Sequence, residues 1–563
     1  EKDSHSPGKA VDNHKEKEKE KERDNEVEPE EKEREKEKEK EKEKEKEKTE
    51  FWSAMRSEIG DLLDVLIQYL ASGCEALISD DLSLLCTLLK GNEQWQNMAW
   101  NLHILPRLLS LLRHGLKFDS SDMMQALQLL LIFSWKERFC TQIARADLVD
   151  DMARMCFSHG SIAMTALVLH VLGNLAAFTE GQAACARHAM LLSKLREHGH
   201  PTIATEAKRL TRLLGFVDMD ACIVERRGIR ILALDGGGMR GVVTGQILQH
   251  LESHLQVPIG EAFDLIVGTS TGGFIAFAIG LMGKRGSDLE EMYRQIGEHV
   301  FLEADRKHAS AIARFFNTVT ARGLSRYSSE KFDAILGQLI STRRVIRFAD
   351  RPTRVAALAT CASNTPGTPF LFRNYNYAGK TQAAGVGFDG SAAFGIPISL
   401  HASAAAPSYF SEVKLKHRHR NRFFQDGGIV RNNPAFAAMT EARAIWGDDY
   451  PIACLVSIGT GAPPVSEGKH AKRFVGRAFK LLVDSSTETA KTHEILEFTL
   501  PKNVYYRFNP VQAIYAADLD ECEPEVLTAI SQATKDFMEE ETQLQRIQML
   551  CKQMNLKPSE DVT

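Results

Sequence analysis

The chain has 563 residues, of which 43% are hydrophobic and 26% are charged, and its formal net charge is −5 at pH 7. This length exceeds one ordinary domain, and the hydrophobic content supports a large buried core. Residues 1–50 hold 16 basic and 21 acidic residues, so residues 51–563 carry 54 of each. That balance excludes an overall electrostatic preference of residues 51–563 for nucleic acid or for anionic lipid.

The first 50 residues differ in kind from the rest. From Lys15 to Lys48 the sequence is an almost unbroken alternation of Lys and Glu with hardly any apolar residue. Such a segment cannot bury a core, although opposite charges at i,i+3 spacing allow transient helix. We predict a disordered or partly helical charged tail over residues 1–50.

Residues 51–219 show helical periodicity with Leu-rich blocks. Three similar blocks begin at Ile104, Leu148 and Leu191, at intervals of 44 and 43 residues. A period of about 40–47 residues is typical of stacked armadillo or HEAT repeats, which bind partners along a concave face or brace a neighbouring domain. We predict an all-α repeat domain here, with an irregular helical bundle as the alternative.

The remaining chain alternates between strand and helix patterns. Apolar runs that predict buried strands occupy residues 230–234, 263–267, 354–360, 369–375 and 452–458. Helical patterns separate them, for example over 329–340 and 434–446. This alternation predicts a mostly parallel sheet covered by helices on both faces, with the reactive groups at the carboxyl ends of the strands.

A serine stands at the apex of a predicted strand-to-helix turn. Gly268 and Gly272 flank Ser270 in a G-x-S-x-G pattern that follows the strand 263–267. This nucleophile elbow exposes the hydroxyl at a helix N-terminus, where developing negative charge is stabilised. On its own the pattern also fits an ordinary glycine-rich turn.

A glycine-rich loop follows the strand 230–234. Gly236, Gly238 and Gly241 satisfy G-x-G-x-x-G, which is also found in dinucleotide-binding turns. Asp235 would face a pyrophosphate, and Arg240 lies between the second and third motif glycines, which argues against that alternative. We favour a loop whose backbone N–H groups stabilise an oxyanion, with a purely structural turn as the remaining alternative.

A serine nucleophile needs a base, and Asp426 is the candidate. It precedes Gly427 and Gly428 at the end of a short predicted strand, 422–425. Taken alone, an Asp-Gly pair is most often a turn. The order of glycine loop, serine elbow and Asp-Gly-Gly is nevertheless difficult to obtain by chance.

These motifs, together with the segment 401–410, resemble the patatin-like phospholipase family, and within it the calcium-independent phospholipase A2-gamma type. The resemblance covers roughly residues 229–435 and continues to about residue 510, where Arg507-Phe508-Asn509-Pro510 is also similar. It departs at Gly428, where the family often has Ala, and at Ala404, where it often has a second serine.

The resemblance implies a Ser-Asp dyad without histidine, in which Ser270 is the nucleophile and Asp426 the base. It assigns the oxyanion site to the glycine loop, namely Gly236, Gly237, Gly238, Arg240 and Gly241. It implies an α/β patatin-like core over 225–435, with 436–563 as the C-terminal part of the catalytic domain.

The resemblance also implies a calcium-independent phospholipase that releases fatty acid and lysophospholipid. We expect no cofactor and no metal, because no carboxylate cluster has calcium-loop spacing. We expect membrane phospholipid to be the substrate and the protein to bind peripherally to a membrane surface. We also expect the repeats to bind a protein partner, and we expect no nucleic-acid partner. The expected location is intracellular and membrane-associated, and the resemblance implies mitochondria or endoplasmic reticulum. Independently, the ten cysteines are scattered and form no C-x-x-C pair, which favours a reducing compartment.

Several alternatives stay open. The enzyme alternative is a neutral-lipid or lysophospholipid acyl hydrolase, and the non-enzyme alternative is a repeat-based interaction protein with a degenerate hydrolase domain. His401 is the best local candidate for a Ser-His-Asp triad, although a supporting role is favoured. The basic run 414–422 is interpreted as a solvated hairpin, with contact to lipid headgroups as the alternative.

Overall fold

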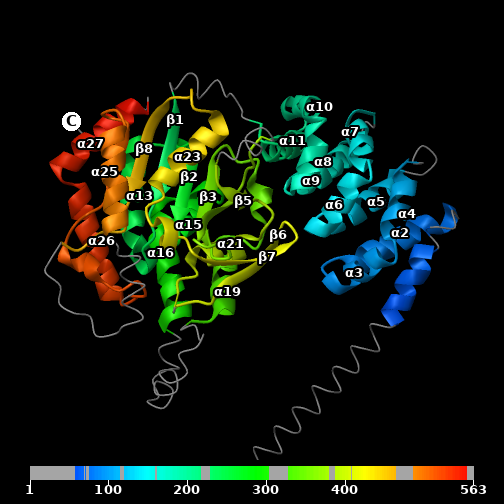
Figure 1. Ribbon diagram of the computed structural model, residues 1–563, viewed down its shortest axis with the longest axis horizontal. Helices are drawn as coiled ribbons and strands as arrows, with labels where there is room; N and C mark the ends of the chain where they lie inside the picture. The colour runs from blue at the N-terminus through cyan, green and yellow to red at the C-terminus, as the bar shows by residue number, and fades with distance from the viewer. Residues whose placement is uncertain are drawn as a thin grey trace, which may run out of the picture. The chain divides into compact units, whose positions relative to one another are not determined.

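The computed structural model describes part of the chain (Figure 1). The described residues are 58–68, 70, 75–113, 120–158, 161–216, 228–302, 327–378, 387–407, 409–464 and 486–554. The Lys/Glu-rich segment 1–50 lies outside them, and so does 217–227, where the boundary between the repeats and the catalytic region is predicted. The described residues fall into two compact units, one ending at Leu129 and one starting at Leu130.

The first unit is helical. Its helices are α2 (Glu75–Leu89), α3 (Glu93–Asn101), α4 (Ile104–Arg113) and the start of α5 (Ser120–Phe133). The Asn92 side chain caps α3 by accepting a hydrogen bond from Trp95 N at 3.1 Å. Helix α4 buries Ile104, Leu108 and Leu111, which recur at helical spacing on one face.

The second unit begins with further helices. These are α6 (Glu137–Arg145), α7 (Leu148–Ser158), α8 (Ile162–Ala176), α9 (Thr179–Ala186), α10 (Ala189–Ser193) and α11 (Pro201–Leu213). Helix α8 is buried along most of its length and contacts α7, α9 and α11. The prediction of an all-α region is confirmed, and the three similar sequence blocks fall on α4, α7 and α10.

In the described residues, the rest of the second unit is built around a nine-stranded sheet. Its order is β5-β4-β3-β2-β1-β8-β9, and β7 pairs with both β3 and β6. The strands are β1 (Ile229–Leu234), β2 (Leu265–Thr269), β3 (Arg354–Cys361), β4 (Thr368–Arg373), β5 (Asp389–Ser391), β6 (Val413–His417), β7 (Arg420–Asp426), β8 (Ile452–Ile458) and β9 (Tyr505–Phe508). The central pairs are parallel, whereas β4 and β7 run antiparallel to β3. The prediction of a mostly parallel sheet is confirmed.

Helices cover both faces of this sheet. They are α13 (Gly241–Leu255), α14 (Ile259–Ala262), α15 (Thr271–Gly280), α16 (Gly286–Ile296), α19 (Ser329–Leu339), α21 (Ile396–Ala404), α22 (Gly428–Arg431), α23 (Ala435–Trp446), α25 (Ser486–Thr499), α26 (Pro524–Met538) and α27 (Glu541–Gln553). Alternate residues of β1 enter different cores: Leu232 joins the cluster that includes α13 and α15, and Ile231 joins the one with α23. Because both faces are covered, β1 is buried throughout.

No helix within the described ranges is long and apolar enough to span a bilayer.

Candidate active site

Ser270 occupies a strained turn between β2 and α15. Its backbone has φ 52° and ψ −118°, a conformation that side-chain-bearing residues rarely adopt. The two flanking glycines permit the turn, because a Cβ on Gly268 would lie 2.0 Å from Gly272 O and a Cβ on Gly272 would lie 2.2 Å from Leu234 O. The Ser270 N–H donates to Ser403 Oγ at 3.0 Å, which fixes the serine backbone against α21.

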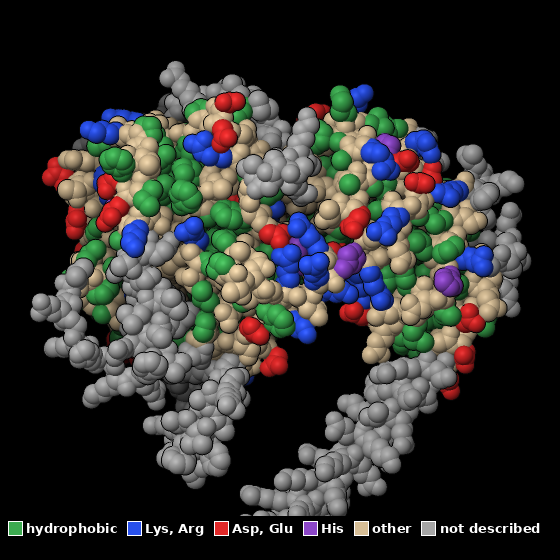
Figure 2. Space-filling model, in the orientation of Figure 1, with side chains coloured by type: hydrophobic (Ala, Val, Ile, Leu, Met, Phe, Trp, Pro, Cys, Tyr) green, Lys and Arg blue, Asp and Glu red, His purple; other side chains and the backbone are tan. Residues whose placement is uncertain are grey.

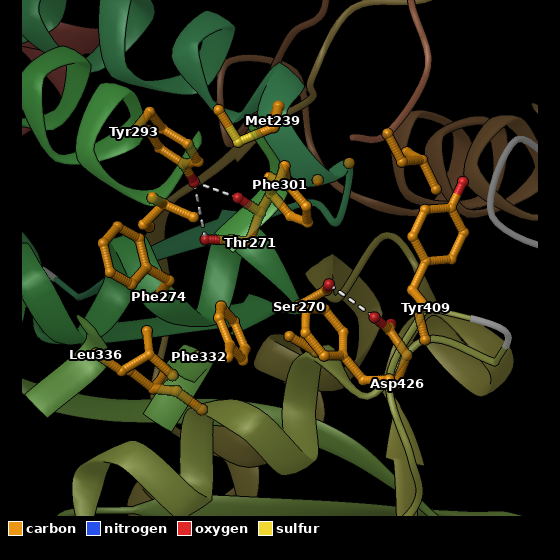
Figure 3. Close-up of a pocket in the computed structure, with 18 of the residues that line it drawn as sticks. Met239, Ser270, Thr271, Phe274, Tyr293, Phe301, Phe332, Leu336, Tyr409 and Asp426 are labelled. Carbon is orange, nitrogen blue, oxygen red and sulfur yellow. Dashed lines mark hydrogen bonds between the residues drawn. The ribbon is translucent and has the colours of Figure 1, made fainter. Parts of the chain in front are cut away.

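Asp426 lies at the end of β7, within hydrogen-bond distance of the serine. Ser270 Oγ donates to Asp426 Oδ2 at 2.7 Å (Figure 3). The strand register explains this proximity: Thr269 of β2 pairs with Leu358 of β3, and the next β3 residue, Ala359, pairs with Asp426. Strand β3 therefore aligns two residues that are 156 positions apart in the chain.

The environment of Asp426 disfavours its charged form. The residue is buried, and this burial raises the pKa of its carboxyl to about 6, although hydrogen bonds from Gly428 N and Ser270 Oγ oppose the shift. The Gly428 N–H donates to Oδ1 at 2.7 Å, which leaves Oδ2 for the serine. A carboxylate with a raised pKa is a better proton acceptor than an ordinary aspartate.

The glycine loop brings two backbone amides to the same cavity. Gly237 and Gly238 line it, and in the described part of the chain neither N–H has an intramolecular acceptor. The loop is held on both sides, because Gly236 N donates to Asn432 O at 3.2 Å and Met239 N donates to Leu519 O at 2.8 Å. The two glycine amides are thus available as oxyanion donors.

A buried ion pair anchors the start of this loop. Asp235 Oδ1 accepts from Arg507 Nη1 at 3.0 Å and Oδ2 accepts from Nη2 at 2.5 Å, in a two-bond fork. Arg507 Nη1 also donates to Ser457 Oγ at 2.7 Å. Arg507 belongs to the C-terminal segment that the resemblance singles out, but the sequence alone does not identify its partner.

The other predicted site residues lie around the cavity rather than in its lining. Arg240 Nη1 donates to Tyr515 O at 2.9 Å and its backbone N–H donates to Gly237 O, so it braces the loop instead of facing the cavity. Gly241 packs against the Tyr293 hydroxyl, and Gly427 packs against Leu358 O.

His401 is buried on α21, and its Nδ1 lies 2.9 Å from Asp333 Oδ1. Ser270 Oγ pairs with Asp426 instead, so the structure does not assemble a Ser-His-Asp arrangement around His401. Among the described residues, no group of three or more His, Cys, Asp or Glu side chains is placed to hold a metal ion.

The cavity beside Ser270 is predominantly apolar. Counted with the solvent at its open mouth, the space is about 760 Å³. Its apolar lining comes from Met239, Phe274, Tyr293, Ile296, Phe301, Phe332, Leu336, Leu400, Ala404, Ala406, Tyr409, Phe410 and Leu519. The Tyr293 hydroxyl is hydrogen-bonded to the Thr271 hydroxyl, so it adds little hydrogen-bonding capacity to the cavity wall (Figure 3).

Sequence reasoning missed most of this lining. The residues on α16 and α19 carry ordinary amphipathic patterns that do not distinguish a cavity wall from a core. The glycine loop, which contains Met239, and the segment 401–410, which carries part of the family resemblance, pointed to some of it.

Comparisons with known proteins show which families the sequence of this region resembles. Residues 232–439 match the family model described as patatin-like phospholipase. The human calcium-independent phospholipase A2-gamma is 34% identical over 342 residues, covering 59% of this chain and 41% of that protein. Phospholipase A I of Arabidopsis thaliana is 31% identical over 380 residues, covering 59% of this chain and 28% of that protein.

A shorter bacterial relative matches as well. The cGAMP-activated phospholipase of Escherichia coli is 28% identical over 252 residues, covering 43% of this chain and 64% of that protein. A designed armadillo repeat protein gives a TM-score of 0.25 at 14% identity, over 28% of this chain and 67% of that protein, which is too low to assign a fold. The chain spans less than half the length of the human and plant relatives. The likeness of this chain to patatin-like phospholipases therefore lies in its catalytic region, where residues 232–439 match the model of that family.

Proposed function

We propose that this protein is a serine acyl hydrolase that cleaves acyl esters of membrane glycerophospholipids to free fatty acid and lysophospholipid. The observation that carries the proposal is the 2.7 Å hydrogen bond from Ser270 Oγ to a buried Asp426 at the edge of an apolar cavity. The names of the relatives support a phospholipase, and calcium-independent is part of one of them.

In the first step Ser270 Oγ attacks the ester carbonyl while Asp426 accepts its proton. The Gly237 and Gly238 amides donate to the oxyanion of the tetrahedral intermediate, and the N-terminus of α15 adds a favourable dipole. Burial matters here, because a dry site raises the basicity of the carboxylate and strengthens each hydrogen bond to the oxyanion.

In the second step the tetrahedral intermediate collapses. The carbon–oxygen bond to the lysophospholipid breaks, and Asp426 returns its proton to the leaving alcohol. Water then attacks the Ser270 acyl ester, Asp426 accepts the water proton, and the fatty acid leaves as the Ser270 hydroxyl is regenerated.

The apolar cavity is suited to bind the fatty acyl chain of the proposed substrate. A fatty acyl chain gains roughly 0.8 kcal/mol per buried methylene, so an apolar cavity next to the nucleophile selects for long acyl esters. The ester groups of a phospholipid bilayer lie near its surface, where an enzyme bound from outside can reach them. We therefore propose peripheral membrane association. The helices of residues 58–216 are proposed to bind a protein partner or to brace the catalytic region.

The first test is fatty acid release from phosphatidylcholine vesicles by the purified full chain, with a metal chelator present. We expect activity in the wild type, and a loss of at least about 1,000-fold in Ser270→Ala and in Asp426→Asn. His401→Gln serves as the matched comparison for a triad and should retain activity. Full activity in Asp426→Asn together with loss in His401→Gln would replace the dyad by a histidine-based mechanism.

A further inference from the structure

Strands β6 and β7 form a hairpin with an unusual turn. The connection consists of Arg418 and His419, which adopt φ of 49° and 61°. Two-residue hairpin turns with positive φ at both positions are normally filled by Asn, Asp and Gly. Two large side chains at such a turn are therefore not explained by backbone preference. Both contact acidic neighbours, since Arg418 lies 3.3 Å from Asp389 and His419 lies 3.9 Å from Glu180.

The solvent-facing side of the hairpin is basic and aromatic. Lys414 and Lys416 are exposed on this side, and Arg418 is exposed in the turn. Arg420 is also exposed next to the turn, although the register pairs it with His417 on the opposite face. The register places Lys414 opposite Phe423, and the Lys414 ammonium lies 5.7 Å from that ring. Figure 2 shows Lys and Arg side chains gathered over this hairpin.

Acidic neighbours neutralise only part of this charge. Asp389 pairs with Arg422 at 2.6 Å and with Arg418 at 3.3 Å. Glu137 accepts from the His419 backbone N–H at 3.2 Å and so holds the tip of the turn. Within the described ranges, Lys414, Lys416 and Arg420 form no ion pair, and their charge faces solvent.

The hairpin is rooted at the rim of the apolar cavity. Tyr409 and Phe410 line the cavity, and β6 begins three residues later at Val413. Strand β7 ends at Asp426, which also lines the cavity. The basic surface is therefore covalently continuous with the catalytic site at both of its ends.

We propose that the exposed side chains of this hairpin, Lys414, Lys416 and Phe423 on one face with Arg418 and Arg420 at the turn, bind anionic phospholipid headgroups at a bilayer surface. This inference rests on the proposed function, because it names the surface on which the cavity would meet its substrate. Basic side chains near an anionic bilayer attract it within about one Debye length, and an apolar ring such as that of Phe423 can be buried at the boundary between headgroups and acyl chains. Although residues 51–563 are neutral overall, the hairpin concentrates positive charge beside the cavity.

The test measures sedimentation of the full chain with vesicles of phosphatidylcholine and phosphatidylserine in equal amounts, and with pure phosphatidylcholine vesicles. All proteins carry Ser270→Ala, so that binding is measured without hydrolysis. In this background, Lys414→Gln/Lys416→Gln should weaken the partition onto anionic vesicles by roughly 25-fold, at about fivefold per basic residue. The charge-preserving Lys414→Arg/Lys416→Arg should bind like its parent.

A matched control removes two exposed lysines elsewhere, in Lys535→Gln/Lys552→Gln on α26 and α27. It should bind like its parent, and thermal melting checks that all variants are folded. Equal binding of the Lys414/Lys416 variant and its parent to anionic vesicles would overturn the proposal, as would equal binding of the parent to both kinds of vesicle. Binding to a single-stranded oligonucleotide but not to anionic vesicles would also overturn it.

The outcome is separable from that of the proposed function. Binding is read in an inactive background, whereas hydrolysis of vesicle lipid is read in the wild type. If the lysine variant loses binding but the wild type releases no fatty acid, the proposed hydrolase activity is refuted and the proposed membrane-binding surface is supported.

Discussion

At the scale of single residues, the burial of Asp426, the proposed base, has a consequence for stability. Burial raises the pKa of its carboxyl to about 6, from an ordinary value of 3.8. Between about pH 4 and pH 6 the folded protein therefore holds a proton that the unfolded chain has lost. The free energy of unfolding falls as pH rises through this range, because charging Asp426 becomes a cost of the folded state.

We therefore predict that Asp426→Asn is more stable than the wild type at pH 7.5, by on the order of 3 kcal/mol, and that this difference disappears near pH 4. Urea unfolding at several pH values measures it. Asp389→Asn is the opposite control. Burial opposes ionisation of Asp389, but His417, whose Nε2 lies 3.7 Å from Oδ1, and the charges of Arg418 and Arg422 hold the pKa of Asp389 below the usual range. That variant should be less stable than the wild type at pH 7.5. A destabilised Asp426→Asn at pH 7.5 would contradict the assigned environment.

At the scale of elements, the glycine loop between β1 and α13 has little freedom to move. Gly238 has φ 59°, and a Cβ there would lie 2.2 Å from Leu519 O. That carbonyl is the acceptor of the Met239 N–H, so a displaced Leu519 would also disturb the loop. The position of the Gly237 and Gly238 amides thus depends on a chain segment more than 280 residues away.

Gly238→Ala should lower kcat by about 100- to 1,000-fold, the loss expected when an oxyanion donor is displaced. Gly283→Ala is the matched control: Gly283 has φ 69°, but a Cβ there would meet nothing within 4 Å, so it shares the backbone strain without the clash. Steady-state kinetics on a soluble ester, with melting temperatures of both variants, provide the comparison. Equal kcat in the two variants would mean that the loop does not contribute to catalysis.

The elements also show what local sequence can reveal. The elbow, the glycine loop and the Asp-Gly-Gly turn each depend on residues adjacent in the chain, so the sequence predicts where they occur. The sheet order and the Asp235–Arg507 pair depend on long-range register, for which the sequence has no local signal. The sequence analysis also missed strand β5, because its three residues carry no strand pattern.

At the scale of the whole molecule, the helices from α8 to α11 pack directly on the catalytic region within the second unit. The Gln182 Nε2 donates to Leu213 O at 3.0 Å and to Tyr377 O at 2.8 Å. Arg212 Nη1 donates to Pro352 O at 3.0 Å, and Asn376 Nδ2 donates to Ala176 O at 3.1 Å. Helices α8, α9 and α11 therefore contact the loops that precede β3 and follow β4. This is the bracing role that the periodicity of residues 51–219 left open beside partner binding.

Gln182→Leu tests this bracing, because it removes two hydrogen bonds and leaves two carbonyls unpaired. We expect a loss of about 1–3 kcal/mol in the free energy of unfolding and faster amide exchange over residues 374–378. Gln532→Leu, at an exposed position of α26, should change stability by less than about 0.5 kcal/mol. Unchanged exchange over 374–378 in Gln182→Leu would show that the helices do not support that segment.

The central claim is that Ser270 and Asp426 act as a two-residue catalytic unit, and the rate of serine modification by a fluorophosphonate tests it most directly. Mass spectrometry of the digested protein locates the adduct, and the wild type, Asp426→Asn and His401→Gln are compared under the same conditions. We predict an adduct on Ser270 in the wild type, a similar rate in His401→Gln and a rate at least about 1,000-fold lower in Asp426→Asn. Rapid labelling of Ser270 in Asp426→Asn, with labelling lost in His401→Gln, would contradict the account.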